Sequence, residues 1–96
     1  MANKKHLAIL KQGVEVWNDW IENNRNIHLD LSNANLKRRN LSKADLSMVD
    51  LCGADLSGVN LQKAHLDAAG LIKANLKNAN LDQASLCDTV FVGANL

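Results

Sequence analysis

The sequence predicts a solenoid, a coil that bends once every five residues and stacks its turns around one shared core. The main observation is a leucine at every fifth position from Leu31 to Leu96, fourteen positions in all, with Phe91 as the single replacement. A second series, of small residues, runs two positions ahead of the leucines, and the remaining positions are mostly polar. Each unit of five is therefore expected to point two side chains inward and three outward.

A period of five fits neither of the two common regular structures. Successive residues of an α-helix are about 100° apart, so residues five apart differ by about 140° and cannot share a face. Side chains of a β-strand alternate, so an odd spacing sends successive leucines to opposite sides. The chain must turn once per unit if all fourteen side chains are to enter one core.

The small residues support this arrangement, because an offset of two keeps two side chains on one side of a short extended segment. Asp or Asn usually stands directly before the leucine, and Asn, Asp and Gly tolerate the backbone conformations that corners require. The small series comprises Ala34, Ala44, Val49, Ala54, Val59, Ala64, Ala69, Ala74, Ala79, Ala84 and Ala94.

Units such as Ala44-Asp45-Leu46-Ser47-Met48 and Ala54-Asp55-Leu56-Ser57-Gly58 repeat in tandem over 29–96. They resemble the A(D/N)LXX motif of the pentapeptide-repeat family, in particular small members of the cyanobacterial type with an N-terminal helix. The resemblance implies an all-β solenoid: a right-handed, four-sided parallel β-helix with four units per coil. Fourteen units then make about 3.5 coils and, at about 4.8 Å per coil, a stack about 17 Å high.

The sequence of residues 1–28 predicts an amphipathic capping helix and a linker ahead of the repeat region 29–96. Asn3 is a suitable N-cap, Asn23 and Asn24 a suitable end, and Gly13 is expected inside one continuous helix at a cost of about 1 kcal/mol. Because the first coil would otherwise expose unpaired backbone and leucines, we expect the helix to lie across it. A membrane-surface helix is the alternative, disfavoured because the polar face carries both charge signs. The capping face comprises Leu7, Leu10, Val14, Trp17 and Ile21.

The charge balance argues against a nucleic-acid partner. The formal net charge is +1, and residues 29–96 carry seven Lys/Arg and seven Asp/Glu, without the basic excess of a nucleic-acid binder. The apolar runs are too short for a signal peptide or a membrane span. Cys52 and Cys87 fall on outward positions of different faces, which favours free thiols in a reducing compartment. We therefore expect a cytoplasmic protein without a membrane interaction.

Arg39 departs from the pattern, because it occupies a small inward slot. A buried, unpaired guanidinium would cost several kcal/mol, so we expect the side chain to reach solvent or to pair with an acid or carbonyl near the helix. An anion or nucleic-acid patch with Lys37, Arg38 and Lys43 is the alternative, weakened by the absence of aromatic residues among these charges.

No catalytic, cofactor or metal site is expected. The three histidines lack metal-ligand spacing with the cysteines, and no nucleophile elbow or phosphate loop occurs. A filled coil also offers no ligand cavity. His65 is expected to lie beside Asp45 of the neighbouring coil, as a surface pair worth less than about 1 kcal/mol.

The candidate interface lies in the C-terminal coil, where apolar residues occupy outward positions and the chain ends on a leucine. The resemblance suggests end-to-end pairing, since some family members associate through this terminus. A different repeat protein is a second possible partner, and a monomer with a frayed last half-coil is a third outcome. The candidate residues are Ile72, Val90, Val92 and Leu96.

The expected function is a non-catalytic interaction or scaffold module that binds a protein partner or a second copy of itself. The resemblance offers one alternative, a DNA mimic that binds and inhibits DNA gyrase. The coil is short and neutral, whereas such a mimic is a long acidic rod, so this alternative is disfavoured. Several outward positions are even basic: Lys37, Lys43, Lys63, Lys73 and Lys77.

Overall fold

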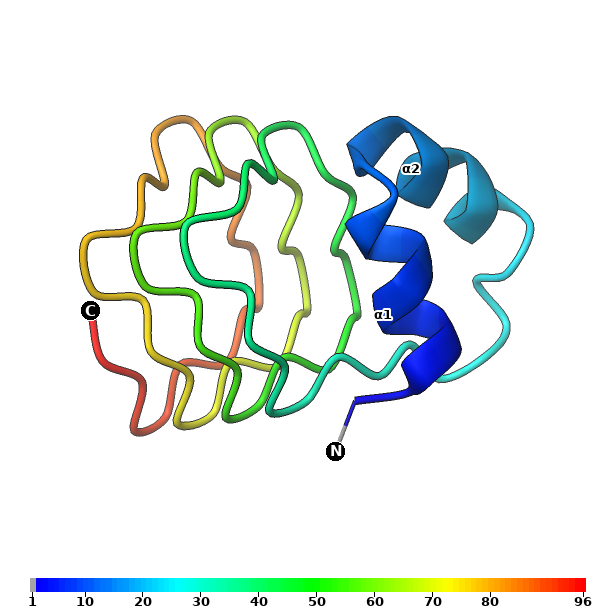
Figure 1. Ribbon diagram of the computed structural model, residues 1–96. Coiled ribbons are helices and arrows are strands. Elements are labelled where there is room, and N and C mark those ends of the chain that lie inside the picture. The colour runs from blue at the N-terminus through cyan, green and yellow to red at the C-terminus, as the bar shows by residue number, and fades with distance from the viewer. Residues whose placement is uncertain (1) are drawn as a thin grey trace.

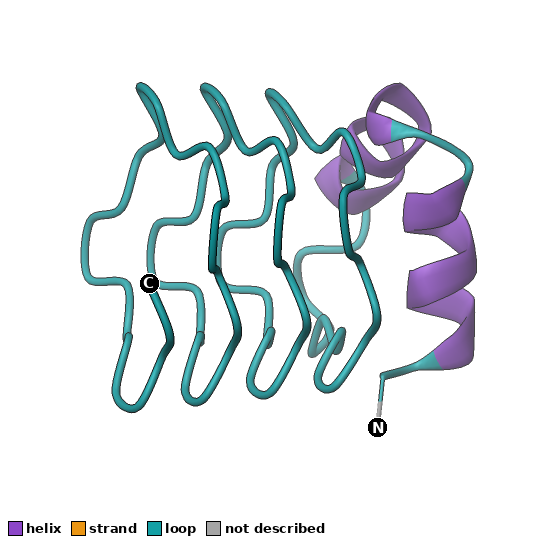
Figure 2. Ribbon diagram, turned by 60° about the vertical axis from the view of Figure 1, so that its left-hand side comes forward, coloured by secondary structure: helices purple, strands orange, loops and turns teal. Residues whose placement is uncertain are grey.

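Two short helices lie across one end of a coil in the computed structural model, which describes residues 2–96 (Figure 1). The helices are α1 (Lys4–Lys11) and α2 (Val14–Glu22). From Asp30 onward the chain winds around one axis, and the view turned by 60° shows its turns stacked in sequence away from the helices (Figure 2). Neither helix has the length and apolar character needed to span a membrane, within the part of the chain described.

The coil takes twenty residues, four units of five, for each turn. The residue before each leucine forms a parallel bridge with the residue twenty positions later, from Asp30 with Asp50 to Asn75 with Asn95. The amide of Leu31 donates to the Asp50 carbonyl and the Asp50 amide donates to the Leu29 carbonyl, both at 2.8 Å. Between residues 2 and 96 these contacts remain isolated bridges, because each extended piece ends at the next corner. The β-helix is thus built without strands of ordinary length.

Each corner is a four-residue turn that begins at the leucine. The Ala34 amide donates to the Leu31 carbonyl at 3.2 Å, and the second of the two residues between them, Asn33, has a φ of 60°. Such a turn needs positive φ at its third residue. The corresponding residues of other corners include Arg38 (φ 58°) and Lys63 (φ 60°).

The expectation that Asn, Asp and Gly supply the corner conformations is only partly right. Ten of the thirteen left-handed corner residues are not glycine, and most of these carry long or methyl side chains. The Asp or Asn before the leucine acts differently, since its side-chain oxygen accepts a hydrogen bond from the amide two residues later. Asp30 accepts in this way from Ser32 at 2.9 Å, and Asn60 from Gln62 at 2.9 Å. These side chains stabilise the turn from a position next to it.

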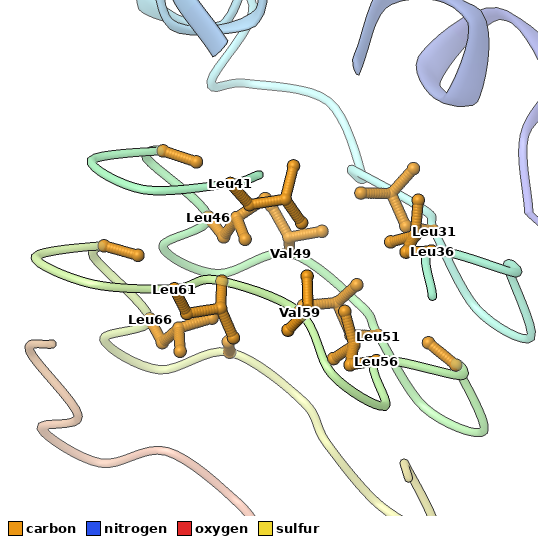
Figure 3. Packing of buried hydrophobic residues seen from close by; sticks show 14 of the residues in the cluster. Leu31, Leu36, Leu41, Leu46, Val49, Leu51, Leu56, Val59, Leu61 and Leu66 are labelled. Atoms are coloured by element: carbon orange, nitrogen blue, oxygen red, sulfur yellow. The ribbon is translucent and has the colours of Figure 1, made fainter. Parts of the chain in front are cut away.

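The core is a ladder of leucines that point from successive turns toward the common axis (Figure 3). Every inward leucine from Leu31 to Leu76 is at most 2% exposed, and the small inward residues of the middle coils are buried beside them. Burying one such leucine contributes about 1.5–3 kcal/mol. Because one turn cannot cover its own leucines, the stacking of turns stabilises the fold.

The prediction of one continuous helix over residues 3–24 is wrong, because the helix breaks at Gly13. Gly13 has φ 125° and ψ 160°, a conformation that essentially only glycine adopts. A straight helix of twenty residues would be about 30 Å long, whereas the two smaller extents of the molecule are 24 and 23 Å. The break allows both helices to stay over the coil end.

The predicted N-cap of the helical segment is present, whereas its predicted C-cap conformation is not. Asn3 caps α1 as predicted, since its side-chain oxygen accepts hydrogen bonds from the amides of Lys5 (2.9 Å) and His6 (3.2 Å). α2 ends at Glu22, and Asn23 has φ −101°, so Asn23 does not take the left-handed conformation that was expected of it.

Candidate interaction surface

The N-terminal end of the coil is covered by the apolar side of the two helices. Trp17 and Ile21 are fully buried and Leu10 is 2% exposed, all in one cluster with the leucines of the coil. Leu7 and Val14 are half-buried and pack against the same cluster. The five residues of the proposed capping face therefore all contact the core in this structure. Val16 is exposed and lies outside the covered surface.

Polar side chains of α2 satisfy backbone groups that a preceding coil would otherwise bind. The Trp17 indole Nε1 donates to the Asp45 carbonyl at 2.7 Å, and Asn18 Nδ2 donates to the Lys43 carbonyl at 3.1 Å. Asn18 Oδ1 also accepts from the Asp45 amide at 2.8 Å. Helical periodicity alone puts Asn18 on the polar side of the helix, and nothing in the sequence marks the coil backbone as its partner.

Residues of α1 and its N-cap close a second edge of the first coil. The Asn3 amide donates to the Asp30 carbonyl at 3.0 Å, and the Asp30 amide donates to His6 Nδ1 at 3.1 Å. His6 is 4% exposed, and its ring centroid lies 5.2 Å from that of Trp20. Burial lowers the pKa of His6 despite the opposing charge of Asp30. A neutral imidazole is what this contact needs, since only a ring nitrogen without a proton can accept the bond.

The linker is attached to the same end by an ion pair. Arg25 Nη2 lies 2.5 Å from Asp45 Oδ2. His65 pairs with Asp45 through the backbone, as expected from their spacing of twenty residues. The carboxylate of Asp45, however, bonds to Arg25, and among the described residues it forms no ion pair with His65. The predicted surface pair is therefore replaced by a pair with the linker.

The four basic residues of the predicted patch, Lys37, Arg38, Arg39 and Lys43, do not all converge on one site. Arg39 is half-buried, and no buried side-chain nitrogen of residues 2–96 lacks a hydrogen-bond partner, so its guanidinium reaches solvent as expected. Lys37 Nζ lies 3.7 Å from Asp55 Oδ2. A hollow of about 450 Å³ is lined by Lys37, Arg38 and Lys77, and neither Arg39 nor Lys43 lines it.

One group of side chains could hold a metal ion, which the sequence expectation did not foresee. His28, Asp30 and Asp50 each offer a ligand atom, and these atoms lie within 4.8 Å of one another. The expectation considered only histidines with cysteines, whereas here the partners are carboxylates twenty residues apart. That spacing is a sequence signal for the pair of aspartates, whereas nothing in the sequence places His28 beside them.

The C-terminal end contrasts with the covered end in its backbone. In the middle of the coil, the amides of Leu61 and Leu66 donate to the carbonyls of Asn80 and Ser85, each at 2.8 Å. The equivalent amides of the last coil, residues 77–96, belong to Leu81, Leu86 and Phe91, and they have no backbone acceptor within the described chain. This end therefore presents extended backbone with free donors.

The inward side chains of the last coil are also partly exposed. Leu81, Leu86 and Phe91 are half-buried, whereas the corresponding leucines one coil earlier, Leu61 and Leu66, are fully buried. The stack covers each coil with the next, and the described chain provides no cover for the last one. The result is an apolar surface framed by free backbone groups.

The four candidate interface residues lie in two places on this end. Ile72 (39% exposed) and Val92 (71%) are twenty residues apart and occupy the same column on adjacent coils. Val90 (42%) is paired with Gly70 and lies beside this column. Leu96 (71%) follows the bridge between Asn75 and Asn95, on the next face. The first three form one apolar strip, and Leu96 extends the end surface separately.

The solved structures similar to this chain include two pentapeptide-repeat proteins of cyanobacteria. HetL of Nostoc sp. strain PCC 7120, described as involved in the regulation of heterocyst differentiation, is 33% identical, with a TM-score of 0.27 over 62% of this chain and 39% of its own. Rfr23 of Cyanothece 51142 is 27% identical, with a TM-score of 0.25 over 68% of this chain and 62% of its own. The chain thus spans less than two thirds of either protein's length. None of the curated proteins compared matches it.

The family comparison rests on the repeat region itself. The family model described as pentapeptide repeats (8 copies) matches residues 30–67 and 69–96, which is more than half of the chain. These are the residues whose leucines build the core and whose backbones pair twenty positions apart. The chain belongs to the pentapeptide-repeat family, and its repeat region forms a β-helix.

Proposed function

We propose that this chain is a non-catalytic interaction module, which binds another protein or a second copy of itself through the C-terminal end of its coil. In this proposal the coil is right-handed and four-sided, with about 3.5 turns, and the helices close its N-terminal end. Pentapeptide-repeat proteins are generally not enzymes, which supports a binding role. The observation that carries the proposal is the contrast between the covered first coil and the uncovered last coil.

The exposed backbone favours a partner that can supply extended backbone of its own. Free amides at Leu81, Leu86 and Phe91 alternate with carbonyls at Ala79 and Ala84 that accept no backbone hydrogen bond within residues 2–96. Edges of this kind pair with another edge by strand addition. Because donors and acceptors occur together, the same surface is able to pair with itself across a two-fold axis.

The apolar side chains add the driving force that backbone pairing lacks. Half-buried Leu81, Leu86 and Phe91 would become covered, and Val92 lies exposed at the margin of the same surface. Burial of apolar area contributes about 25 cal/mol per Å². A charge at Val92 should therefore weaken association without touching the core.

Sedimentation velocity over a wide range of protein concentration tests this proposal. The wild type should associate as concentration rises, and Val92→Lys should weaken association by about tenfold or more, which is 1.4 kcal/mol. Val16→Lys is the matched control, because Val16 is 42% exposed at the helical end. It should associate like the wild type, and both variants should keep the wild-type melting temperature.

A second experiment tests for a protein partner other than a second copy of this chain. The wild type and Val92→Lys are immobilised in parallel and exposed to an extract of the native host. A protein retained by the wild type and by Val16→Lys, but not by Val92→Lys, would assign the surface to that protein. A wild type that stays monomeric and retains the same proteins as Val92→Lys would refute the proposal.

A further inference from the structure

We propose that His28, Asp30 and Asp50 form a binding site for a first-row divalent metal ion such as Zn²⁺, where the linker meets the first two coils. His28 belongs to the linker, Asp30 to the first coil and Asp50 to the second. One ligand atom from each lies within 4.8 Å of the others, and His28 Nε2 is 3.7 Å from Asp50 Oδ2. The site lies at the helical end of the coil and does not depend on the proposed function.

The spacing of the ligand atoms suits direct coordination. Zinc binds histidine nitrogen and carboxylate oxygen at about 2.0–2.2 Å, which puts neighbouring ligand atoms of a tetrahedral site about 3.4 Å apart. His28 Nε2 and Asp50 Oδ2 lie 3.7 Å apart, close to that value, and the three ligand atoms all lie within 4.8 Å of one another, so small side-chain rotations would complete the site. The His28 side chain is 72% exposed, so it can rotate toward the ion without disturbing packed residues.

Both carboxylates are held in place by hydrogen bonds to one of their oxygens. Asp30 Oδ1 accepts from the Ser32 amide (2.9 Å) and hydroxyl (2.7 Å), and Asp50 Oδ1 accepts from the Cys52 amide at 3.0 Å. These bonds leave the second oxygen of each group for a ligand. Partners of this kind orient metal-binding carboxylates in known sites.

The pair of carboxylates is itself an argument for a cation, independent of the histidine. Among the ten bridged pairs of the described coil, Asp30 with Asp50 is the one that places two like charges opposite each other. Like charges directly opposite are destabilising. Arg25 of the linker is bonded to Asp45 and forms no ion pair with Asp30 or Asp50 among the described residues. A cation between Asp30 and Asp50 would remove the repulsion and satisfy both groups.

The donor set selects the class of metal. One imidazole nitrogen with two carboxylate oxygens suits Zn²⁺, Co²⁺ or Ni²⁺, whereas Ca²⁺ and Mg²⁺ prefer oxygen ligands alone. Water would complete the coordination. A bound ion would join the linker to two successive coils, so metal binding should stabilise the attachment of the helices to the coil.

Calorimetric titration and thermal unfolding with Zn²⁺ and Co²⁺ test the site in the full chain. The wild type should bind one ion, and its melting temperature should rise with metal concentration until binding saturates. His28→Gln and Asp50→Asn should each weaken binding by about tenfold or more. Each variant is compared with its own metal-free state, so a change in basal stability does not confuse the result. Mg²⁺ at equal concentration should give no shift.

Three control variants separate this site from other donors. His65→Gln removes an exposed histidine of a different column, and Cys52→Ser and Cys87→Ser remove the two free thiols. All three should bind like the wild type. The proposal is overturned if the wild type binds no ion, if His28→Gln binds with wild-type affinity, or if a control variant loses binding.

Discussion

The indole Nε1 of Trp17 lies 2.7 Å from the carbonyl oxygen of Asp45, a residue of the first coil that is 28 positions later in the chain. Trp17 is fully buried, so this polar contact lies within the apolar contact between α2 and the coil. A coil preceding the first one would offer a backbone amide at this place. Trp17 thus provides the two contacts that a preceding coil would make here, a hydrogen-bond donor for the Asp45 carbonyl and apolar cover for the core.

Replacing Trp17 with Phe should lower the free energy of unfolding by about 1–3 kcal/mol. A phenyl ring still fills most of the space of the indole, but the Asp45 carbonyl loses its donor in a partly buried place. Chemical denaturation monitored by circular dichroism measures the change. Trp20→Phe is the control, because the Trp20 indole donates no hydrogen bond within the described chain and its side chain is only half-buried. Equal losses in the two variants would contradict the role assigned to the Trp17 donor.

Gly13→Ala distinguishes two helices from one by the sign of its effect. In a continuous helix, alanine would be more stable than glycine by about 1 kcal/mol. In the observed structure Gly13 has φ 125°, which alanine adopts only with strain, so the variant should lose about 1–3 kcal/mol. No atom lies within 4 Å of the added methyl group, so the loss would come from the backbone alone. A stabilised variant would contradict the break at Gly13 and support one continuous helix.

Leu61→Ala and Leu96→Ala are the same substitution, made at a buried position and at an exposed position. Leu61 is fully buried between two coils, so its truncation should cost about 2–5 kcal/mol. Leu96 is 71% exposed at the end of the coil, and its truncation in the dilute protein should change stability by less than about 0.5 kcal/mol. Thermal and chemical unfolding of both variants measure the difference. Similar costs at the two positions would show that the last coil is covered in the dilute state.

Protonation of Asp45 should account for part of the free energy of unfolding that the protein loses in acid. Burial raises the pKa of Asp45, but hydrogen bonds from Arg25 and Ser47 and the charge of Arg25 outweigh it, so the pKa lies below the usual 3.8. The unfolded chain then binds a proton more readily than the folded one. The contribution is present above about pH 4 and is lost as the pH falls through 3.8 and below.

Unfolding free energies at a series of pH values check this sign. Asp45→Asn should show a shallower acid loss than the wild type, because one of the stabilising carboxylates is gone. Asp82→Asn provides the comparison, since the Asp82 side chain is exposed and accepts no hydrogen bond among the described residues. An Asp45→Asn profile that is parallel to the wild-type profile would show that Arg25 and Asp45 are not coupled in solution.

Much of the coil follows from the leucine positions, because a five-residue period leaves the chain one way to bury them together. The pairing of Asp30 with Asp50 then follows once four units make a turn, a number that came from the family resemblance. The break at Gly13 could not be foreseen, since the apolar pattern continues through it from Leu10 to Val14. What decides the break is the width of the coil end, a property of the assembled fold.

The polar contacts were the least predictable part of the molecule. Asn18 is a surface residue by helical periodicity, and its two bonds to the coil edge depend on how α2 is placed after the break. His28, Asp30 and Asp50 come from three successive segments, and only the winding of the chain brings them together. The apolar strip of Ile72, Val90 and Val92 could be placed in advance, because residues twenty apart stack.

Amide hydrogen exchange, read residue by residue, tests most directly the claim that one end of the coil is covered and the other is not. In dilute protein the amides of Leu61 and Leu66 should exchange slowly, since each donates to the next coil, while those of Leu81, Leu86 and Phe91 should exchange rapidly. The latter three should become protected as the protein concentration rises. Strong protection of Leu81 and Leu86 at all concentrations, or rapid exchange at Leu61, would contradict this account.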